Sequence, residues 1–220
     1  FDWLLTHEFG HEWWANKVTN KDWAHMWIQE GICTFGDVLY LREMEGEEAY
    51  LKKMQQTARS TRNTKPIVQG EVIDTDDTYH SDIYGKGAFF MHTLRYVIGD
   101  EVFFPTLKKL ATDTRYSYDN FVTTGDVEKL FSGESGQDLS KLFDFYLRTV
   151  NKLEIQVRQT GDNTYTVKLL NFDGALPFDV IDDEGPKRRT IDKTGISVTS
   201  SKGWPVVDPK GFYLKKVVLE

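Results

Sequence analysis

The sequence predicts a multidomain protein of α plus β class, in which helices in residues 1–150 precede a small antiparallel β-sandwich in residues 151–220. Apolar residues recur at helical spacing through the first two thirds of the chain, which is typical of amphipathic helices. After Val150 the sequence changes to short runs that alternate apolar and polar residues, which is typical of strands. We therefore expect a domain boundary near Asn151, with an immunoglobulin-like sandwich after it.

Helical periodicity predicts a series of helices before that boundary. The expected ranges are Phe1–Ala15, Trp23–Met44, Glu47–Arg62, Tyr84–Ile98, Glu101–Thr112, Asp126–Phe131 and Leu139–Val150. Thr124 and Asp138 offer N-cap oxygens to the last two of these helices, and Gly99 is placed to end the helix Tyr84–Ile98. Between Thr64 and Ile83 the periodicity stops, which predicts a long ordered loop or a pair of short strands.

Strands are expected wherever the alternating runs occur after Val150. The runs are LEIQVRQ, TYTVKLL, LPFDVID, RRTIDKT, ISVTSS, WPVVD and FYLKKVVLE. Turn signals such as GDN, FDG, DEGP and DPKG separate them at intervals of about ten residues, the spacing of a small antiparallel sandwich.

Composition excludes several classes of function. The chain of 220 residues has a net charge of −7 and no basic cluster larger than KRR at 187–189, so its field repels nucleic acid. Its one cysteine, Cys33, permits neither an intrachain disulfide nor a thiolate-rich zinc site. No apolar run reaches the roughly 20 residues that a membrane span needs. A metal ion in this chain would therefore be held by histidine and carboxylate.

The stretch HEFGH at residues 7–11 has the pattern of a metal-binding helix. His7 and His11 are four residues apart, so they project from one face of a helix and can bind one ion. Glu8 is turned by roughly 100° from His7 around the helix. That position suits a general base for water activated by the metal.

Glu30 is the candidate for a third ligand. It lies in a second helical segment, with eighteen residues between it and His11, enough for the chain to turn back. Two histidines and one glutamate are a known ligand set of catalytic zinc, which leaves a fourth position open for water.

The segment HEWWANKVTNKDWAHMWIQEG resembles the zinc site of the aminopeptidase N and leukotriene hydrolase family, whose motif is H-E-x-x-H, eighteen residues, then E. Further matching positions are Trp14, Asn16, Val18, Thr19, Trp23, Trp27 and Gly31. Ala15 departs from the family, in which glycine is more common at that position.

The resemblance implies a gluzincin with a thermolysin-like helical catalytic subdomain, one zinc ion and aminopeptidase activity on peptides. By the same resemblance, Tyr84 in YGKGA matches the family's catalytic tyrosine and would donate a hydrogen bond to the developing oxyanion. Tyr79 matches a tyrosine of some members and is assigned to substrate binding.

Two other functions stay open at this point. A zinc endopeptidase of thermolysin type also uses H-E-x-x-H with a distant glutamate, and a non-catalytic interaction module could hold a structural zinc. Members of the family hold the substrate's amino terminus with a G-x-M-E-N motif upstream of the zinc helix, and this sequence has none. We therefore expect the chain to be a piece of a longer protein, weakly active or inactive by itself. The sequence does not indicate its localisation or oligomeric state.

The remaining polar residues have ordinary interpretations. We expect His92 to pack in an apolar helix and His25 and His80 to lie at the surface. Cys33 is expected to be a small packed residue, and Glu12 to point away from the two histidines. The acidic run DTDD at 74–77 is a solvated loop or part of a substrate cleft.

Overall fold

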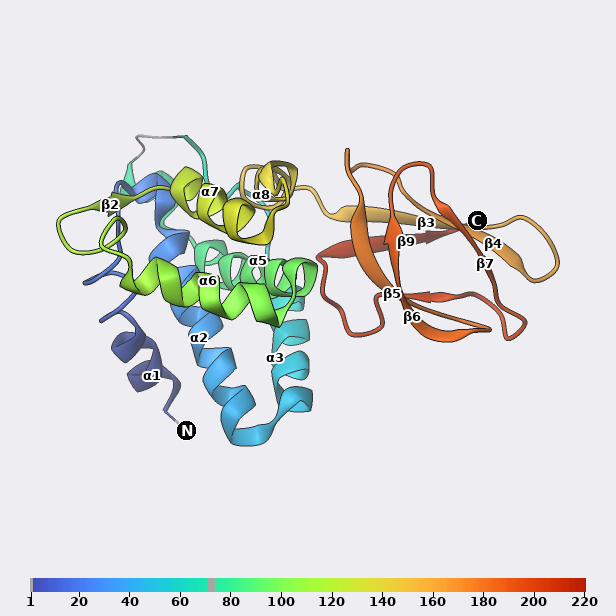
Figure 1. Cartoon of the computed structure of the whole chain (residues 1–220), viewed down its shortest axis with the longest axis horizontal. Helices are drawn as coiled ribbons and strands as arrows, with labels where there is room; N and C mark the ends of the chain where they lie inside the picture. The colour runs from blue at the N-terminus through green and yellow to red at the C-terminus, as the bar shows by residue number, and fades with distance from the viewer. Residues whose placement is uncertain (1, 71–73) are drawn as a thin grey trace. The chain divides into compact units, whose positions relative to one another are not determined.

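The chain is described here by a computed structural model, which covers residues 2–70 and 74–220. The chain divides into two compact units, Phe1–Val150 and Asn151–Glu220. The first is helical and the second is built from strands (Figure 1). The predicted mixed architecture, a helical part followed by a sheet part, is therefore confirmed in this coarser form.

The helices of the first unit follow the apolar periodicity, with shifted ends. They are α1 (Trp3–Gly10), the 3-10 turn η1 (Trp23–His25), α2 (Trp27–Glu45), α3 (Glu47–Ser60), α4 (Thr75–Thr78), α5 (Asp82–Ile98), α6 (Asp100–Thr112), α7 (Thr124–Ser135) and α8 (Ser140–Leu147). The first expected helix ends at Gly10 instead of Ala15, and its expected start at Phe1 lies outside the described residues.

The expected loop at 64–83 is largely irregular where it is described, as one of the two predictions had it. Its described part contains the one-turn helix α4 and no strand, and residues 71–73 lie outside the described range. Elsewhere, β1 (Thr19–Asn20) pairs in parallel with β2 (Phe121–Val122), a ladder that the sequence analysis did not predict. This ladder joins segments about 100 residues apart along the chain.

The N-caps of α7 and α8 differ from those predicted from the sequence. The N-cap of α7 is Thr123 instead of Thr124, because its side chain accepts from Asp126 N while the Asp126 carboxylate accepts from Thr123 N. Asp138 accepts from Ser140 N at 3.0 Å, although Leu139 occupies the N-cap position of α8. Gly99 ends α5 with φ of 82°, as predicted.

The core of the helical unit surrounds α5. Nearly every residue of this helix is buried, which is the pattern of a helix enclosed on all sides. Figure 1 shows α2 and α3 as a hairpin beside it. Where α2 crosses α5, a Cβ added to Gly31 would lie 2.8 Å from the Gly87 Cα atom. Only glycine allows the two backbones to come this close.

The second unit contains two sheets. Its strands are β3 (Leu153–Gln159), β4 (Thr164–Leu169), β5 (Leu176–Asp182), β6 (Gly185–Ile191), β7 (Ile196–Thr199), β8 (Val206–Val207) and β9 (Lys215–Leu219). One sheet has the order β7-β4-β3-β9 and the other β6-β5-β8. The expectation of a wholly antiparallel structure is wrong, because β9 runs parallel to β3.

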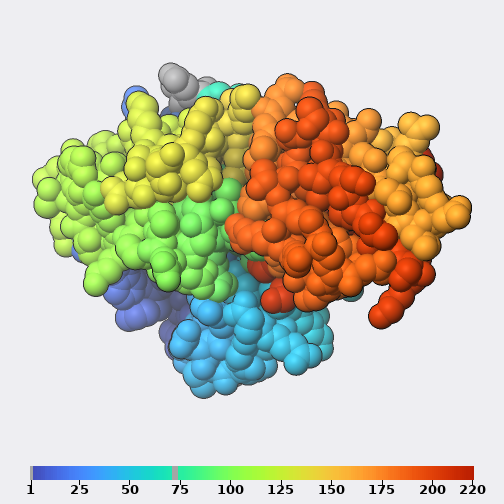
Figure 2. Space-filling model, turned by 45° about the vertical axis from the view of Figure 1, so that its right-hand side comes forward, coloured from blue at the N-terminus to red at the C-terminus, as the bar shows by residue number. Residues whose placement is uncertain are grey.

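Burial alternates along the longer strands of this unit. In β3, Leu153, Ile155 and Val157 are fully buried while their neighbours are more exposed, and β4 and β5 follow the same rule. Each of these strands therefore turns one face to an apolar core. In Figure 2 the second unit forms the amber, orange and red surface.

No helix within residues 2–70 and 74–220 combines the length and the apolarity that crossing a bilayer would require.

Candidate metal centre

Helix α1 is held in place at both ends. The Asp2 side chain accepts from Leu5 N at 3.1 Å and caps the helix, which satisfies one of the free amides of the first turn. At the other end, a Cβ added to Gly10 would lie 3.2 Å from Cys33 Sγ on α2. The close approach of these two residues sets α1 against the helix that carries Glu30.

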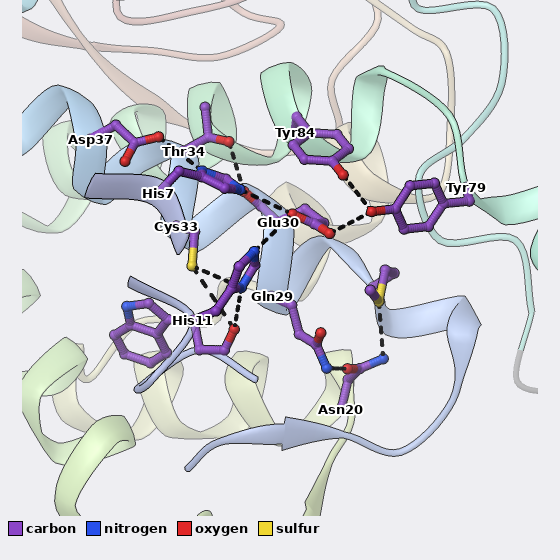
Figure 3. Close-up of polar contacts among 12 residues, drawn as sticks. His7, His11, Asn20, Gln29, Glu30, Cys33, Thr34, Asp37, Tyr79 and Tyr84 are labelled. Atoms are coloured by element: carbon purple, nitrogen blue, oxygen red, sulfur yellow. Dashed lines mark hydrogen bonds and ion pairs between the residues drawn. The ribbon is translucent and has the colours of Figure 1, made fainter. Parts of the chain in front are cut away.

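Three potential ligand atoms meet where α1 faces α2 (Figure 3). The ligand atoms of His7, His11 and Glu30 lie within 4.8 Å of one another. Glu30 Oε2 is 3.2 Å from His7 Nε2 and 3.4 Å from His11 Nε2. Ligands of tetrahedral zinc, with bonds of about 2.0–2.1 Å, are about 3.4 Å apart. The two distances from Glu30 Oε2 to the histidine nitrogens are therefore close to that spacing.

The second nitrogen of each imidazole contacts an oxygen of the protein. His7 Nδ1 is 2.9 Å from Asp37 Oδ2, and His11 Nδ1 is 3.0 Å from the Trp14 carbonyl oxygen. A neutral imidazole with its proton on Nδ1 donates to these acceptors and leaves the Nε2 lone pair for a metal. Both rings thus present Nε2 to the shared site.

The site is negatively charged around the imidazoles. Hydrogen bonds to Asp37 and to Glu30 raise the pKa of His7 to about 9. Burial raises the pKa of Glu30, but hydrogen bonds from His7 and Tyr79 outweigh burial and hold that pKa below its usual value. A metal ion would replace the proton on His7 Nε2, because a ligating imidazole must be neutral.

The two tyrosines predicted from the sequence lie on the other side of Glu30 (Figure 3). The Tyr79 hydroxyl donates to Glu30 Oε1 at 2.7 Å and also contacts the Tyr84 hydroxyl. The Tyr84 ring lies 5.9 Å from the His7 ring, centroid to centroid. Burial, then the contact with Tyr79, raises the pKa of Tyr84 above its usual value, so this hydroxyl keeps its proton.

The acidic residues near the histidines differ in position. Glu8 is exposed and lies one residue from His7 on α1. Burial is the main cause of the raised pKa of Tyr79, and the negative charge of Glu8 also contributes. Glu12 is also exposed and accepts from Asn16 Nδ2 at 3.3 Å. Asp74 caps α4 within the DTDD run.

Cys33 is buried, as predicted for a packed residue. Burial raises the pKa of its thiol, so the side chain stays protonated. A protonated thiol is a poor nucleophile, and the sulfur lies 3.3 Å from His11 Nδ1. We therefore assign Cys33 to the packing around the second histidine.

The prediction that His25 lies at the surface is wrong. Only 7% of this residue is exposed. Its Nδ1 lies 3.0 Å from Thr124 Oγ1, which also accepts from Trp27 Nε1. His80 is half-buried instead of lying at the surface. His92 is fully buried, with Nδ1 2.7 Å from the Tyr50 hydroxyl, as expected for a packed histidine.

Asp37 is the residue of this site that the sequence analysis missed. It lies seven residues after Glu30, two turns along the same face of α2,. That spacing is the signal that could have revealed it, because a carboxylate on the face of a ligand often accepts from a ligating histidine.

A comparison with protein families finds one matching model. Residues 2–146 match the model of the peptidase family M1 domain. The matched range contains every residue of the site described above, and four residues separate its end from the start of the second unit.

Curated relatives match the same part of the chain. Leucine aminopeptidase 2 of Ajellomyces capsulatus is 27% identical over 144 residues, which are 60% of this chain and 23% of that protein. Aminopeptidase N of Lactococcus lactis is 29% identical over 155 residues, 66% of this chain and 18% of that protein. The chain therefore spans about a fifth of the length of these relatives.

Two solved structures share the fold. Aminopeptidase A of Legionella pneumophila, solved with aspartic acid, has a TM-score of 0.77 at 19% identity over 99% of this chain and 27% of that one. An M1 zinc metallopeptidase mutant of Deinococcus radiodurans, solved with a Tyr-Ser-Ala substrate, has a TM-score of 0.57 at 23% identity over 67% of this chain and 33% of that one.

Proposed function

Because the chain belongs to peptidase family M1, we propose that it is the zinc-binding catalytic part of an aminopeptidase that releases N-terminal residues from peptides. The observation that carries this proposal is the spacing of the Nε2 atoms of His7 and His11 from Glu30 Oε2, 3.2 and 3.4 Å. Relatives named as aminopeptidases support the choice of reaction.

One zinc ion would be held by His7, His11 and Glu30. When bound, zinc supplies Lewis acidity, which makes water a nucleophile at neutral pH and polarises a carbonyl group. Asp37 holds His7 in the orientation and tautomer that a ligand needs,. Three protein ligands favour catalysis over a structural role, because structural zinc usually has four.

Glu8 would act as general base and then as general acid. Its carboxylate accepts a proton from the attacking water and delivers that proton to the leaving amine. Two features support this role. Glu8 follows the ligand His7 on α1, and its side chain is exposed, so it can reach both solvent and substrate.

Tyr84 would stabilise the oxyanion that develops on the substrate carbonyl. Its raised pKa keeps the hydroxyl protonated, and a donor fixed in place before the reaction lowers the barrier most. Tyr79 would bind substrate and help to place Tyr84, because its hydroxyl contacts both Tyr84 and the ligand Glu30.

We further propose that the two units are a thermolysin-like catalytic subdomain and an immunoglobulin-like β-sandwich. The helix pair α1 and α2, with its ligands, supports the first assignment. The alternating burial of β3, β4 and β5 supports the second, since the two sheets of a sandwich share one core.

The decisive experiment combines metal analysis with two substitutions. We expect about one zinc per chain in protein purified without chelator. Glu8→Gln should keep that zinc, yet lower hydrolysis of an aminoacyl nitroanilide by the full-length protein by about 100-fold or more, because a general base is lost. Glu12→Gln, an exposed glutamate one turn further on, should retain activity.

Absence of zinc, even after titration with the metal, would refute the metal assignment. Undiminished turnover by Glu8→Gln would remove Glu8 from the role of base. Cleavage of amino-blocked and free-amino peptides at equal rates would instead identify an endopeptidase.

A further inference from the structure

The helical unit contains a second chemically distinctive region, a cavity of about 730 Å³. Its lining includes Lys21, His25, Thr123, Gly125, Lys129 and Arg148. None of the proposed zinc ligands or catalytic residues lines it. The cavity is therefore separate from the metal centre, and an inference about it does not depend on the proposed peptidase activity.

The charge of the lining contrasts with the charge of the chain. All the charged side chains around the cavity are basic, although the chain as a whole carries −7. Arg148 is partly neutralised, because its guanidinium is 2.7 Å from Asp144 and 3.7 Å from Glu128. Lys21 and Lys129 form no ion pair with any carboxylate in residues 2–70 and 74–220.

The backbone explains why these cations converge. The parallel strands β1 and β2 end at the same edge, where Lys21 N donates to the Val122 carbonyl oxygen at 2.9 Å. Lys21 follows β1, and Thr123 follows β2 and caps α7, which carries Lys129. The start of this helix is already capped by Thr123 and by the Asp126 carboxylate, so the positive charge at this edge comes from the lysine side chains.

One wall of the cavity is rigid. His25 is buried and contacts Thr124 Oγ1 at 3.0 Å and Thr124 N at 3.3 Å. These contacts fix η1, which follows Lys21, to the first turn of α7, which carries Gly125. The two cationic segments thus keep their separation without a ligand, which lowers the entropic cost of binding one.

We propose that this cavity binds a small multivalent oxyanion, of the phosphate or polycarboxylate class. Lysine ammonium groups are point charges that suit such oxygens, and the planar Arg148 guanidinium has further donors beyond those used by Asp144. A volume of about 730 Å³ is in the range of sites for small organic ligands. A monovalent ion such as chloride would leave most of that space and charge uncompensated.

The test is calorimetric titration of the 220-residue chain with pyrophosphate and, separately, with citrate. We expect saturable binding of at least one of them, with the stronger ligand identifying the class. Lys21→Gln/Lys129→Gln should weaken binding by about tenfold or more, because two positive charges that form no ion pair within the protein are lost. The matched control Lys108→Gln/Lys202→Gln removes the same charge from exposed lysines outside the cavity and should bind normally.

Circular dichroism of both double variants would verify that each is folded; the four substituted lysines are exposed. The proposal is overturned if neither oxyanion binds at millimolar concentration. It is equally overturned if both double variants lose the same affinity, since that result would reflect only the overall charge of the chain.

Discussion

In each histidine of the proposed metal centre, the two ring nitrogens contact different groups. Nδ1 of His7 contacts Asp37, Nδ1 of His11 contacts a backbone carbonyl, and both Nε2 atoms approach Glu30. Rotation of either ring would break a hydrogen bond on one side as well as a ligand contact on the other. The orientation of the proposed ligands is thus determined by the protein itself.

Lys86 gives a prediction about pH. Its side chain is fully buried, and Nζ donates to the Thr149 carbonyl oxygen at 2.6 Å. Burial lowers the pKa of this lysine to about 8, whereas an unfolded lysine has a pKa of about 10.4. Between these values the unfolded chain binds more protons, so the free energy of unfolding rises with pH through this window. Below pH 8 both states are protonated, and the cost of the buried charge is fully present.

Urea denaturation of the wild type and of Lys86→Met at pH 7 to 10 would measure this effect. We expect the wild type to gain up to about 3 kcal/mol relative to the variant between pH 8 and 10.4. Lys108→Met, at an exposed lysine, should follow the wild type. Parallel curves for the wild type and Lys86→Met would show that the buried lysine does not titrate in this range.

The crossing of α2 and α5 links both segments of the proposed active site. Gly31 follows Glu30, a proposed zinc ligand, and Gly87 lies one turn after Tyr84 on α5. Their backbones touch, since an added Cβ on either residue would come within 3.0 Å of the other's Cα atom. This contact helps to set how far Glu30 on α2 lies from Tyr84 on α5.

Gly31→Ala should therefore push the two helices apart. We expect a loss of about 1–3 kcal/mol in the free energy of unfolding, as for other overpacked positions, together with weaker zinc binding. Gly36→Ala is the matched control, because this position in the same helix has nothing within 4 Å of an added Cβ. That variant should be as stable as the wild type or more so, because alanine is the better helix former. Equal stability of the two variants would contradict the role of the crossing.

The sequence predicted elements whose pattern is local. Helical periodicity located α2, α3 and α5, and the spacing of His7, His11 and Glu30 indicated one shared site. The sequence did not predict the pairing of β1 with β2, because two-residue strands are too short to show a period. It also did not predict the direction of β9, because apolar and polar residues alternate in the same way in parallel and antiparallel strands. The burial of His25 was not predicted, because its polar partner Thr124 lies 99 residues away along the chain.

The residues proposed for zinc binding and catalysis all lie in one of the two units. Every residue proposed for zinc binding or catalysis belongs to the unit that ends at Val150, as does the basic cavity. The sheet unit has its own core, with fully buried residues on β3, β4 and β5. Binding of a metal should therefore stabilise one unit and leave the local stability of the other unchanged.

Hydrogen exchange followed by mass spectrometry can measure that difference. Removing zinc with a chelator should speed exchange in α1, α2 and α5, since a ligand present at 100 times its dissociation constant stabilises the folded state by about 2.7 kcal/mol. Strands β3 to β9 should exchange as before, and added zinc, but not magnesium, should restore protection in the helices. Equal deprotection of the strands would show that the units unfold together.

The parallel pairing of β3 with β9 has a consequence for the order of events during synthesis. Leu153 pairs with Lys215, so the strand that begins the second unit obtains this neighbour only after about 60 more residues have been made. Until then one edge of β3 has only open amide and carbonyl groups, which are prone to pair with other chains. In the helical unit the short ladder of β1 with β2 also joins segments about 100 residues apart, but each helix forms its own hydrogen bonds between residues close in sequence. On the ribosome, the helices can therefore form before β9 has been made and has paired with β3.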